Sequence, residues 1–105
     1  MVKIEPYEKD GRWYIDKDPD DKLYYVANVT SQLVDSATTA LSFEALSQGV
    51  EVLEKGSPQG DRGGLLPVKL TGMGGDDEES YCIFRVTCAN TEQFDRTIYF
   101  NRVDK

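Results

Sequence analysis

Hydrophobic and polar residues alternate along most of this chain in short runs, separated by segments rich in Gly, Pro and Asp. A period of two places successive side chains on opposite faces of an extended backbone, so each run predicts a half-buried β-strand. The predicted strands cover residues 12–15, 23–29, 38–45, 50–54, 65–71, 81–89 and 94–103. Seven short strands, with no helical segment long enough to cover a sheet, predict an all-β, immunoglobulin-like antiparallel sandwich of two sheets. We expect one domain over residues 1–105, because single domains are most often ~100–150 residues long.

Two of these runs admit more than one structure. Residues 38–45 contain Ala, Leu and Glu, which also suit a helix. The alternation of Leu41 and Phe43 with polar residues favours a strand that points both apolar side chains into the core. Pro67 has no N–H to donate to a ladder, so 65–71 is expected to be an edge strand or to begin after Pro67.

The connections between the strands differ in composition. Residues 31–36 predict a polar loop that Leu33 anchors as an apolar plug. Residues 55–64 contain four glycines and a proline, a density that predicts an exposed, mobile loop. Residues 72–80 predict a second flexible loop whose acidic run 76–79 favours a solvated segment, with a metal or a basic partner as the alternative.

The two cysteines, Cys82 and Cys88, lie in the same predicted strand. At ~3.3 Å per residue their Cα atoms would be ~20 Å apart, whereas a disulfide requires less than ~7 Å. Their even spacing places both beside Phe84 and Val86 on one face. We therefore expect two small, buried, unbridged side chains.

The composition argues against nucleic-acid binding, membrane binding and catalysis. The chain carries 12 Lys and Arg against 19 Asp and Glu, a net charge of −7 that disfavours nucleic acid and anionic membranes as partners. It contains no His, which is the commonest general base and metal ligand. No Ser-x-x-Lys motif or phosphate-binding glycine loop replaces it. The sequence predicts a non-enzymatic protein without a cofactor or a catalytic residue. The absence of a signal-peptide pattern or a long apolar run predicts a chain that is made and kept in the cytosol, or assembled from there into something larger.

The acidic turn 16–21 raises the question of calcium, which binds oxygen ligands. Asp16, Asp18 and Asp20 match the first half of an EF-hand loop. The match then ends, because Asp21 stands where that loop needs Gly and Ala27 where it needs Glu. We favour a turn in which Asp side chains accept backbone N–H groups and Pro19 restricts φ. A calcium site stays the alternative.

Three stretches occur here in a familiar order: 17–23 with Tyr25, then 49–52, then 85–88 followed by 95–98. They read KDPDDKL, GVEV, RVTC and DRTI. This order resembles a family of small phage and prophage immunoglobulin-like proteins with a KDPD turn, and the likeness covers roughly residues 14–103. The chain departs from the family pattern at Val29, where many members have Trp, and in its longer 55–64 loop.

The resemblance implies a virion structural or assembly protein, associated with the phage head or tail. It implies contacts with other phage structural proteins or with further copies of the chain. It also implies a location in the bacterial cytoplasm during assembly and then in the virion.

Aromatic residues supply the candidate interface. Tyr and Trp are enriched where proteins meet, so Trp13, Tyr24, Tyr81 and Tyr99 would mark such a surface if they lie exposed together. We favour the alternative, in which the aromatic residues fill the core or are scattered as amphipathic residues on the sheet faces. Tyr81, at the start of its strand, is also placed to form a tyrosine corner. The alternative function is a ligand-binding or adhesion module, which predicts that the loops 55–64 and 72–80 cluster at one end, with or without calcium.

Overall fold

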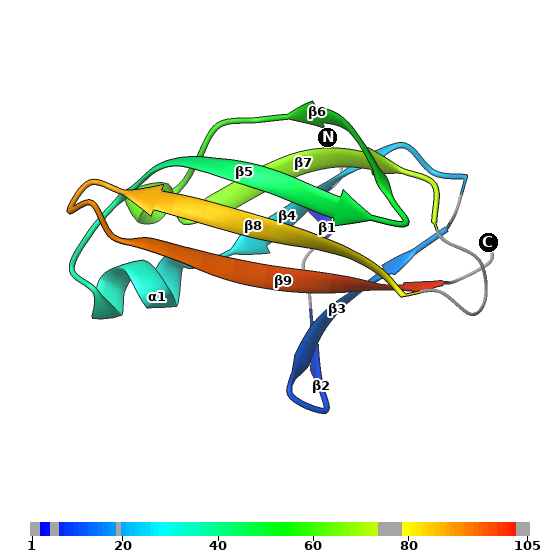
Figure 1. The fold of residues 1–105 in the computed structure, drawn as a ribbon, viewed down its shortest axis with the longest axis horizontal. Helices are drawn as coiled ribbons and strands as arrows, with labels where there is room; N and C mark the ends of the chain where they lie inside the picture. Colours follow the sequence, from blue (N-terminus) through cyan, green and yellow to red (C-terminus); the bar gives the residue numbers. More distant parts are fainter. Residues whose placement is uncertain (1–2, 5–6, 19, 74–78, 103–105) are drawn as a thin grey trace.

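The computed structural model describes residues 3–4, 7–18, 20–73 and 79–102. They form two β-sheets, with one short α-helix and one 3-10 turn in the connections (Figure 1). In chain order the elements are β1 (Lys3–Ile4), β2 (Tyr7–Lys9), β3 (Arg12–Lys17), β4 (Leu23–Asn28), α1 (Thr30–Asp35), β5 (Ala40–Gln48), β6 (Glu51–Lys55), η1 (Asp61–Gly63), β7 (Leu65–Thr71), β8 (Ser80–Cys88) and β9 (Gln93–Arg102). Within the described ranges, no helix is long and apolar enough to cross a membrane.

The strand order is that of an immunoglobulin-like sandwich. One sheet has the order β1-β4-β7-β6 and the other β2-β3-β9-β8-β5. The antiparallel trios β4-β7-β6 and β5-β8-β9 correspond to strands B-E-D and C-F-G of the constant-type domain. The predicted all-β, two-sheet fold is confirmed. Two pairs are parallel rather than antiparallel as predicted, namely β1 with β4 and β3 with β9.

The core lies between the sheets and takes alternate residues from each long strand. In β8 the inward residues Cys82, Phe84, Val86 and Cys88 are all buried, as the alternation predicts. Both cysteines are free thiols, which confirms that they do not bridge. Full burial of each large apolar side chain stabilises the fold by ~1.5–3 kcal/mol, so this inner layer holds the two sheets together.

The first predicted strand, β3, is the second arm of a hairpin whose first arm, β2, was not predicted from the sequence. Strands β2 and β3 pair through a turn at Asp10 and Gly11, with φ of 52° and 79°. Two consecutive positive φ values define a type I′ turn, which Asp-Gly favours strongly. The dipeptide was a usable signal, but the polar residues around it concealed the alternation.

The predicted polar loop at 31–36 is instead the helix α1. Its six residues bury a single side chain, Leu33, which is 0% exposed. The expected apolar plug is therefore confirmed, although the backbone around it is helical. One buried residue in less than two turns produces no helical periodicity, so the pattern could not reveal the helix.

Leu41 does not face the core as predicted; it is 61% exposed, whereas Phe43 is buried. The pairing of β5 with β8 slips between Ala40 and Ser42, which identifies a β-bulge at Leu41. A bulge inserts one unpaired residue and reverses the alternation on one side of it. Residues 40–48 are nevertheless a strand, as the alternation predicts.

Pro67 lies inside a central strand, so the expectation of an edge strand is wrong. Strand β7 is flanked by β4 and β6, and Pro67 pairs with Val26. The carbonyl of Pro67 accepts the N–H of Gly56 at 3.0 Å. The edge of β7 on which Pro67 has no N–H therefore faces Gly56, the residue that follows the end of β6. A Cβ on Gly56 would lie 2.7 Å from Cγ of Pro67, which makes glycine the compatible neighbour.

The loop 55–64 is mostly exposed, as predicted, but its backbone is tied to the sandwich. Gln59 bridges to Leu65, and the carbonyl of Gly64 accepts the N–H of Val29 at 2.8 Å. The guanidinium of Arg62 donates to the carbonyl of Thr38 at 3.2 Å. The run therefore turns back against α1 and β5 instead of projecting from the domain. In the second loop, residues 74–78 lie outside the described residues.

Candidate functional site

Three tyrosines form a row across the outer face of the five-stranded sheet. Tyr14 of β3, Tyr99 of β9 and Tyr81 of β8 are direct register partners on neighbouring strands. The ring centroids of Tyr14 and Tyr99 are 5.8 Å apart, and those of Tyr99 and Tyr81 are 5.9 Å apart. The Tyr81 hydroxyl extends the row to β5 by donating to Oε1 of Gln48 at 3.2 Å. These half-buried rings lock one another through cross-strand contacts.

A second row of apolar side chains adjoins the tyrosines. Ile83 of β8 is paired with Leu46 of β5 on one side and with Thr97 of β9 on the other. Leu46 is 39% exposed, and the other two are half-buried. We call the surface formed by Tyr14, Ile83, Leu46, Tyr81 and Tyr99 the tyrosine face.

Ion pairs border the tyrosine face on two sides. Arg12 pairs with Glu79 at 3.1 Å, and its guanidinium carbon lies 4.5 Å from the centroid of the Tyr99 ring. On the opposite side, Arg85 binds both carboxylate oxygens of Asp95, at 3.0 and 3.2 Å. The hydrogen bond from Arg85 lowers the pKa of Asp95, and Glu79 raises the pKa of Arg12. The result is an aromatic and aliphatic centre between charged groups that neutralise one another.

Only two of the four predicted interface residues belong to this surface. Tyr81 and Tyr99 lie together as the prediction required, but Trp13 packs against the core on the inner side of β3. Tyr24 lies on the other sheet, where its ring centroid is 5.9 Å from Nζ of Lys69. The four residues therefore do not form one patch.

Tyr14 is the interface candidate that the sequence analysis overlooked. In the run Trp13-Tyr14-Ile15, burial of Ile15 fixes the inward positions, so Tyr14 must point outward and Trp13 inward. Applied to the aromatic residues, that alternation would have selected Tyr14 over Trp13. The predicted tyrosine corner is also wrong, because the Tyr81 hydroxyl binds the side chain of Gln48 rather than a nearby backbone group.

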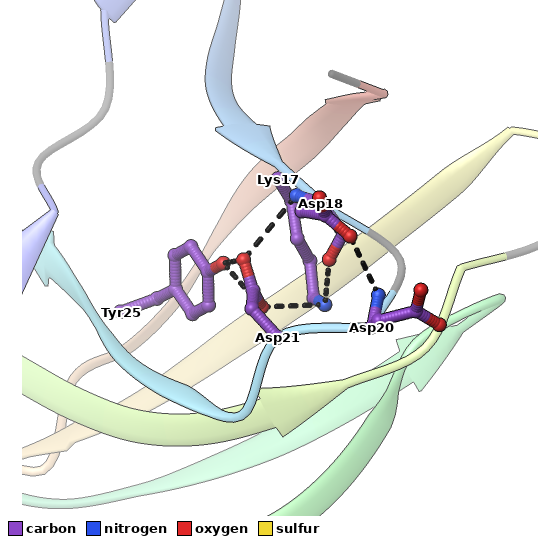
Figure 2. A network of polar contacts seen from close by, with 5 residues as sticks. All are labelled: Lys17, Asp18, Asp20, Asp21 and Tyr25. Atoms are coloured by element: carbon purple, nitrogen blue, oxygen red, sulfur yellow. Dashed lines mark hydrogen bonds and ion pairs between the residues drawn. The ribbon is translucent and has the colours of Figure 1, made fainter. Parts of the chain in front are cut away.

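The acidic turn has a structural role centred on a buried lysine (Figure 2). Lys17 is 0% exposed, and its ammonium donates to Oδ1 of Asp21 at 2.9 Å and to the carbonyl of Asp18 at 3.1 Å. The Tyr25 hydroxyl donates to the same Asp21 carboxylate, at 2.8–2.9 Å. Burial and then the Asp21 hydrogen bond raise the pKa of Tyr25, which keeps the phenol protonated. The network joins the end of β3 to β4.

Two carboxylates of the turn, those of Asp18 and Asp21, also accept backbone N–H groups. Oδ1 of Asp18 accepts the N–H of Asp20 at 2.9 Å, and Oδ2 of Asp21 accepts the N–H of Asp18 at 3.2 Å. This is the favoured turn arrangement, while Pro19 lies outside the described residues. No group of three potential metal ligands occurs within the described ranges.

The two cysteines and the hollow beside α1 are further candidate places for catalytic side chains among the described residues. Burial raises the pKa of Cys82 to about 12 and also raises that of Cys88, which disfavours the nucleophilic thiolate of both.

The hollow, of about 520 Å³, lies beside α1 and is lined by Trp13, residues 28–32 and Arg96. Its only ionisable side chain is Arg96, so it contains no acid–base pair.

The two long loops leave the sandwich at opposite ends. Residues 55–64 precede β7 and residues 72–79 follow it, so the seven residues of that strand separate their attachment points. The attachment points of the loops 55–64 and 72–80 therefore lie at opposite ends, whereas the ligand-binding alternative predicted clustering at one end; residues 74–78 lie outside the described residues.

No family model, curated protein or solved structure matched this chain. A function must therefore be inferred from the residues themselves, and the tyrosine face joins three cross-strand tyrosines to an exposed Leu46.

Proposed function

We propose that this chain is a non-enzymatic contact module that binds another protein through the tyrosine face. We further propose, from the KDPD-family resemblance, that it serves as a structural or assembly component of a phage virion, in the head or tail. Its partners are other structural proteins of the phage. It acts in the bacterial cytoplasm during assembly and afterwards in the particle.

The observation that carries this proposal is the arrangement of residue types on the outer sheet. Protein interfaces typically have an aromatic and apolar centre with a polar rim, enriched in Tyr and Arg and depleted in Lys. The tyrosine face has three Tyr at its centre, and Arg12 and Arg85 at its borders. Its rows contain no lysine.

Rigidity adds to this argument. Each tyrosine ring of the row contacts the next, and Arg12 covers Tyr99, so little side-chain freedom remains to be lost on binding. The face sits on four neighbouring strands of one sheet, β3, β9, β8 and β5, rather than on loops. A preorganised aromatic surface binds a partner with a smaller entropic cost than a flexible one.

The test uses particles from the phage or lysogen that encodes the chain. We expect mass spectrometry of purified virions to find the chain in stoichiometric amount. Tyr99→Ser together with Tyr81→Ser should remove it from the particles, because the pair forms the centre of the face.

Tyr24→Ser is the matched control, since Tyr24 lies on the other sheet beside Lys69. This variant should enter particles as the wild type does. Normal virions that lack the wild-type chain would refute the virion role. Equal incorporation of the double variant would refute the tyrosine face as the contact surface.

A further inference from the structure

Strand β5 forms an edge of the five-stranded sheet. It pairs with β8 along 40–48, and no described strand pairs with its other side. Nζ of Lys55, from the other sheet, reaches the carbonyl of Phe43, so the backbone groups of Phe43 point away from β8. Backbone direction alternates along a strand, so Ala45 and Ser47 also direct their N–H and C=O groups outward. Such an edge is a template for a further strand.

The first half of this edge is covered. The turn η1 lies against its beginning, where a Cβ on Gly63 would meet the carbonyl of Ala40 at 2.8 Å. The bulge at Leu41 interrupts the regular ladder. Lys55 then covers Phe43, with a hydrogen bond of 2.6 Å to its carbonyl and its ammonium 5.3 Å from the ring centroid. Lysines at a sheet edge and β-bulges are devices that keep edges from pairing.

The second half of the edge is self-complementary. If two copies of β5 ran antiparallel about a two-fold axis at Ala45, that residue would pair with itself and Phe43 with Ser47 of the other copy. Three such residue pairs offer six hydrogen bonds, and two of these would end on the carbonyls of Phe43 that Lys55 occupies. Glu44 would lie opposite Leu46, so no like charges would meet.

We propose that β5 is a self-association strand through which a second copy of this chain adds antiparallel, and that Lys55 restrains this pairing. The dimer joins two five-stranded sheets into one continuous sheet. Each copy must first release Lys55 from Phe43, so the wild type pairs only weakly. This inference rests on the β5 edge and is independent of the partner proposed for the tyrosine face.

The test compares Lys55→Met with the wild type by sedimentation from micromolar to millimolar concentration. Methionine keeps the apolar stem but donates no hydrogen bond. A hydrogen bond from a charged group is worth ~1.5–3 kcal/mol, so we expect the variant to dimerise at least ~10-fold more tightly. The matched control, Lys69→Met, removes a lysine from central strand β7 and should behave as the wild type.

Two further variants test whether the dimer forms through β5. Ala45→Pro in the Lys55→Met background should restore the monomer, because its missing N–H points to the free edge and β8 pairing is kept. Tyr99→Ser in the same background should leave the dimer intact, which separates this test from that of the tyrosine face. Amide exchange at Phe43, Ala45 and Ser47 should slow in the dimer. A Lys55→Met protein that stays monomeric, or a dimer that survives Ala45→Pro, would overturn the proposal.

Discussion

Lys17 is a fully buried cation, and only a few oxygen atoms around it replace the water that its charge has lost. The Asp21 carboxylate accepts a hydrogen bond from the Lys17 ammonium and another from the Tyr25 hydroxyl, while the Asp18 carbonyl accepts a second hydrogen bond from Lys17. Removing one partner of a buried pair leaves an uncompensated charge, which costs far more than the intact pair contributes. At this scale the acidic turn therefore stabilises the fold through specific contacts.

Asp21→Asn should lower the free energy of unfolding by ~3–5 kcal/mol, because the amide keeps the shape but not the charge that Lys17 requires. Urea denaturation provides the measurement. Asp20→Asn is the control, since the Asp20 side chain is exposed, and it should change stability by less than ~0.5 kcal/mol. Equal effects of the two substitutions would contradict the structural role of the pair.

The buried thiol of Cys82 should make the protein less stable in alkali. Its pKa is raised from 9.0 to about 12 by burial, so the folded state keeps a proton that the unfolded state loses. This contribution is complete below pH 9 and is lost as the pH rises from 9 towards 12, by up to ~1.4 kcal/mol per pH unit. Cys82→Ala should show a shallower decline of unfolding free energy with pH than the wild type. Parallel declines would exclude the thiol as a cause.

Residue-level predictions were good where alternation was regular and failed where it was interrupted. The inward positions of β8 follow directly from the sequence, because no bulge disturbs that strand. Leu41 was misplaced because a bulge leaves no mark in the pattern of residue types. The selection of Trp13 over Tyr14 was different, since the alternation with Ile15 contained the answer.

Among the elements, the connections were harder to predict than the strands. Helix α1 is stabilised by tertiary contact rather than by its own sequence, since it buries only Leu33. Pro67 is tolerated centrally because β6 ends before reaching it, a fact about the neighbouring strand rather than about β7 itself. Such features depend on residues distant in the chain and have no local signal.

Gly64 should be a sensitive point in the contact between η1 and α1. A Cβ there would overlap Oγ1 of Thr30 and come within 2.8 Å of its Cα, although the backbone φ of −77° would accept any residue. Gly64→Ala should therefore destabilise the fold by ~1–3 kcal/mol through overpacking. Thr30→Ala in the same chain removes the hydroxyl and should recover part of the loss, which a double-mutant cycle measures. Strict additivity of the two changes would contradict the clash.

At the scale of the whole molecule, Lys17 and Asp18 of the KDPD sequence have a structural role that joins the two sheets. Lys17, Asp18, Asp21 and Tyr25 contact one another where β3 crosses to β4 (Figure 2). The sandwich class could be predicted from sequence because many strands contribute to it independently. The position of the tyrosine face could not, since it requires the register between strands that are distant in the chain.

Calcium should leave the stability of the domain unchanged, because Asp21 is engaged by Lys17 and Tyr25 and Asp18 binds backbone groups. Thermal melts in calcium and in EDTA should give the same midpoint. A ligand present at 100 times its dissociation constant would add ~2.7 kcal/mol and raise the midpoint by ~10 °C or more. A rise of that size would restore the calcium-dependent alternative.

The parallel pairing of β3 with β9 sets an order of events during synthesis. Asp16 and Asn101, which hydrogen-bond across these strands, are 85 residues apart. At ~5–20 residues per second the ribosome needs ~4–17 s between them. Throughout that time β3 lacks β9, the strand with which it pairs in the folded sheet (Figure 1). The emerging chain therefore carries an unpaired hairpin edge until nearly all of β9 is made, and this interval is when it is most exposed to mispairing with its neighbours.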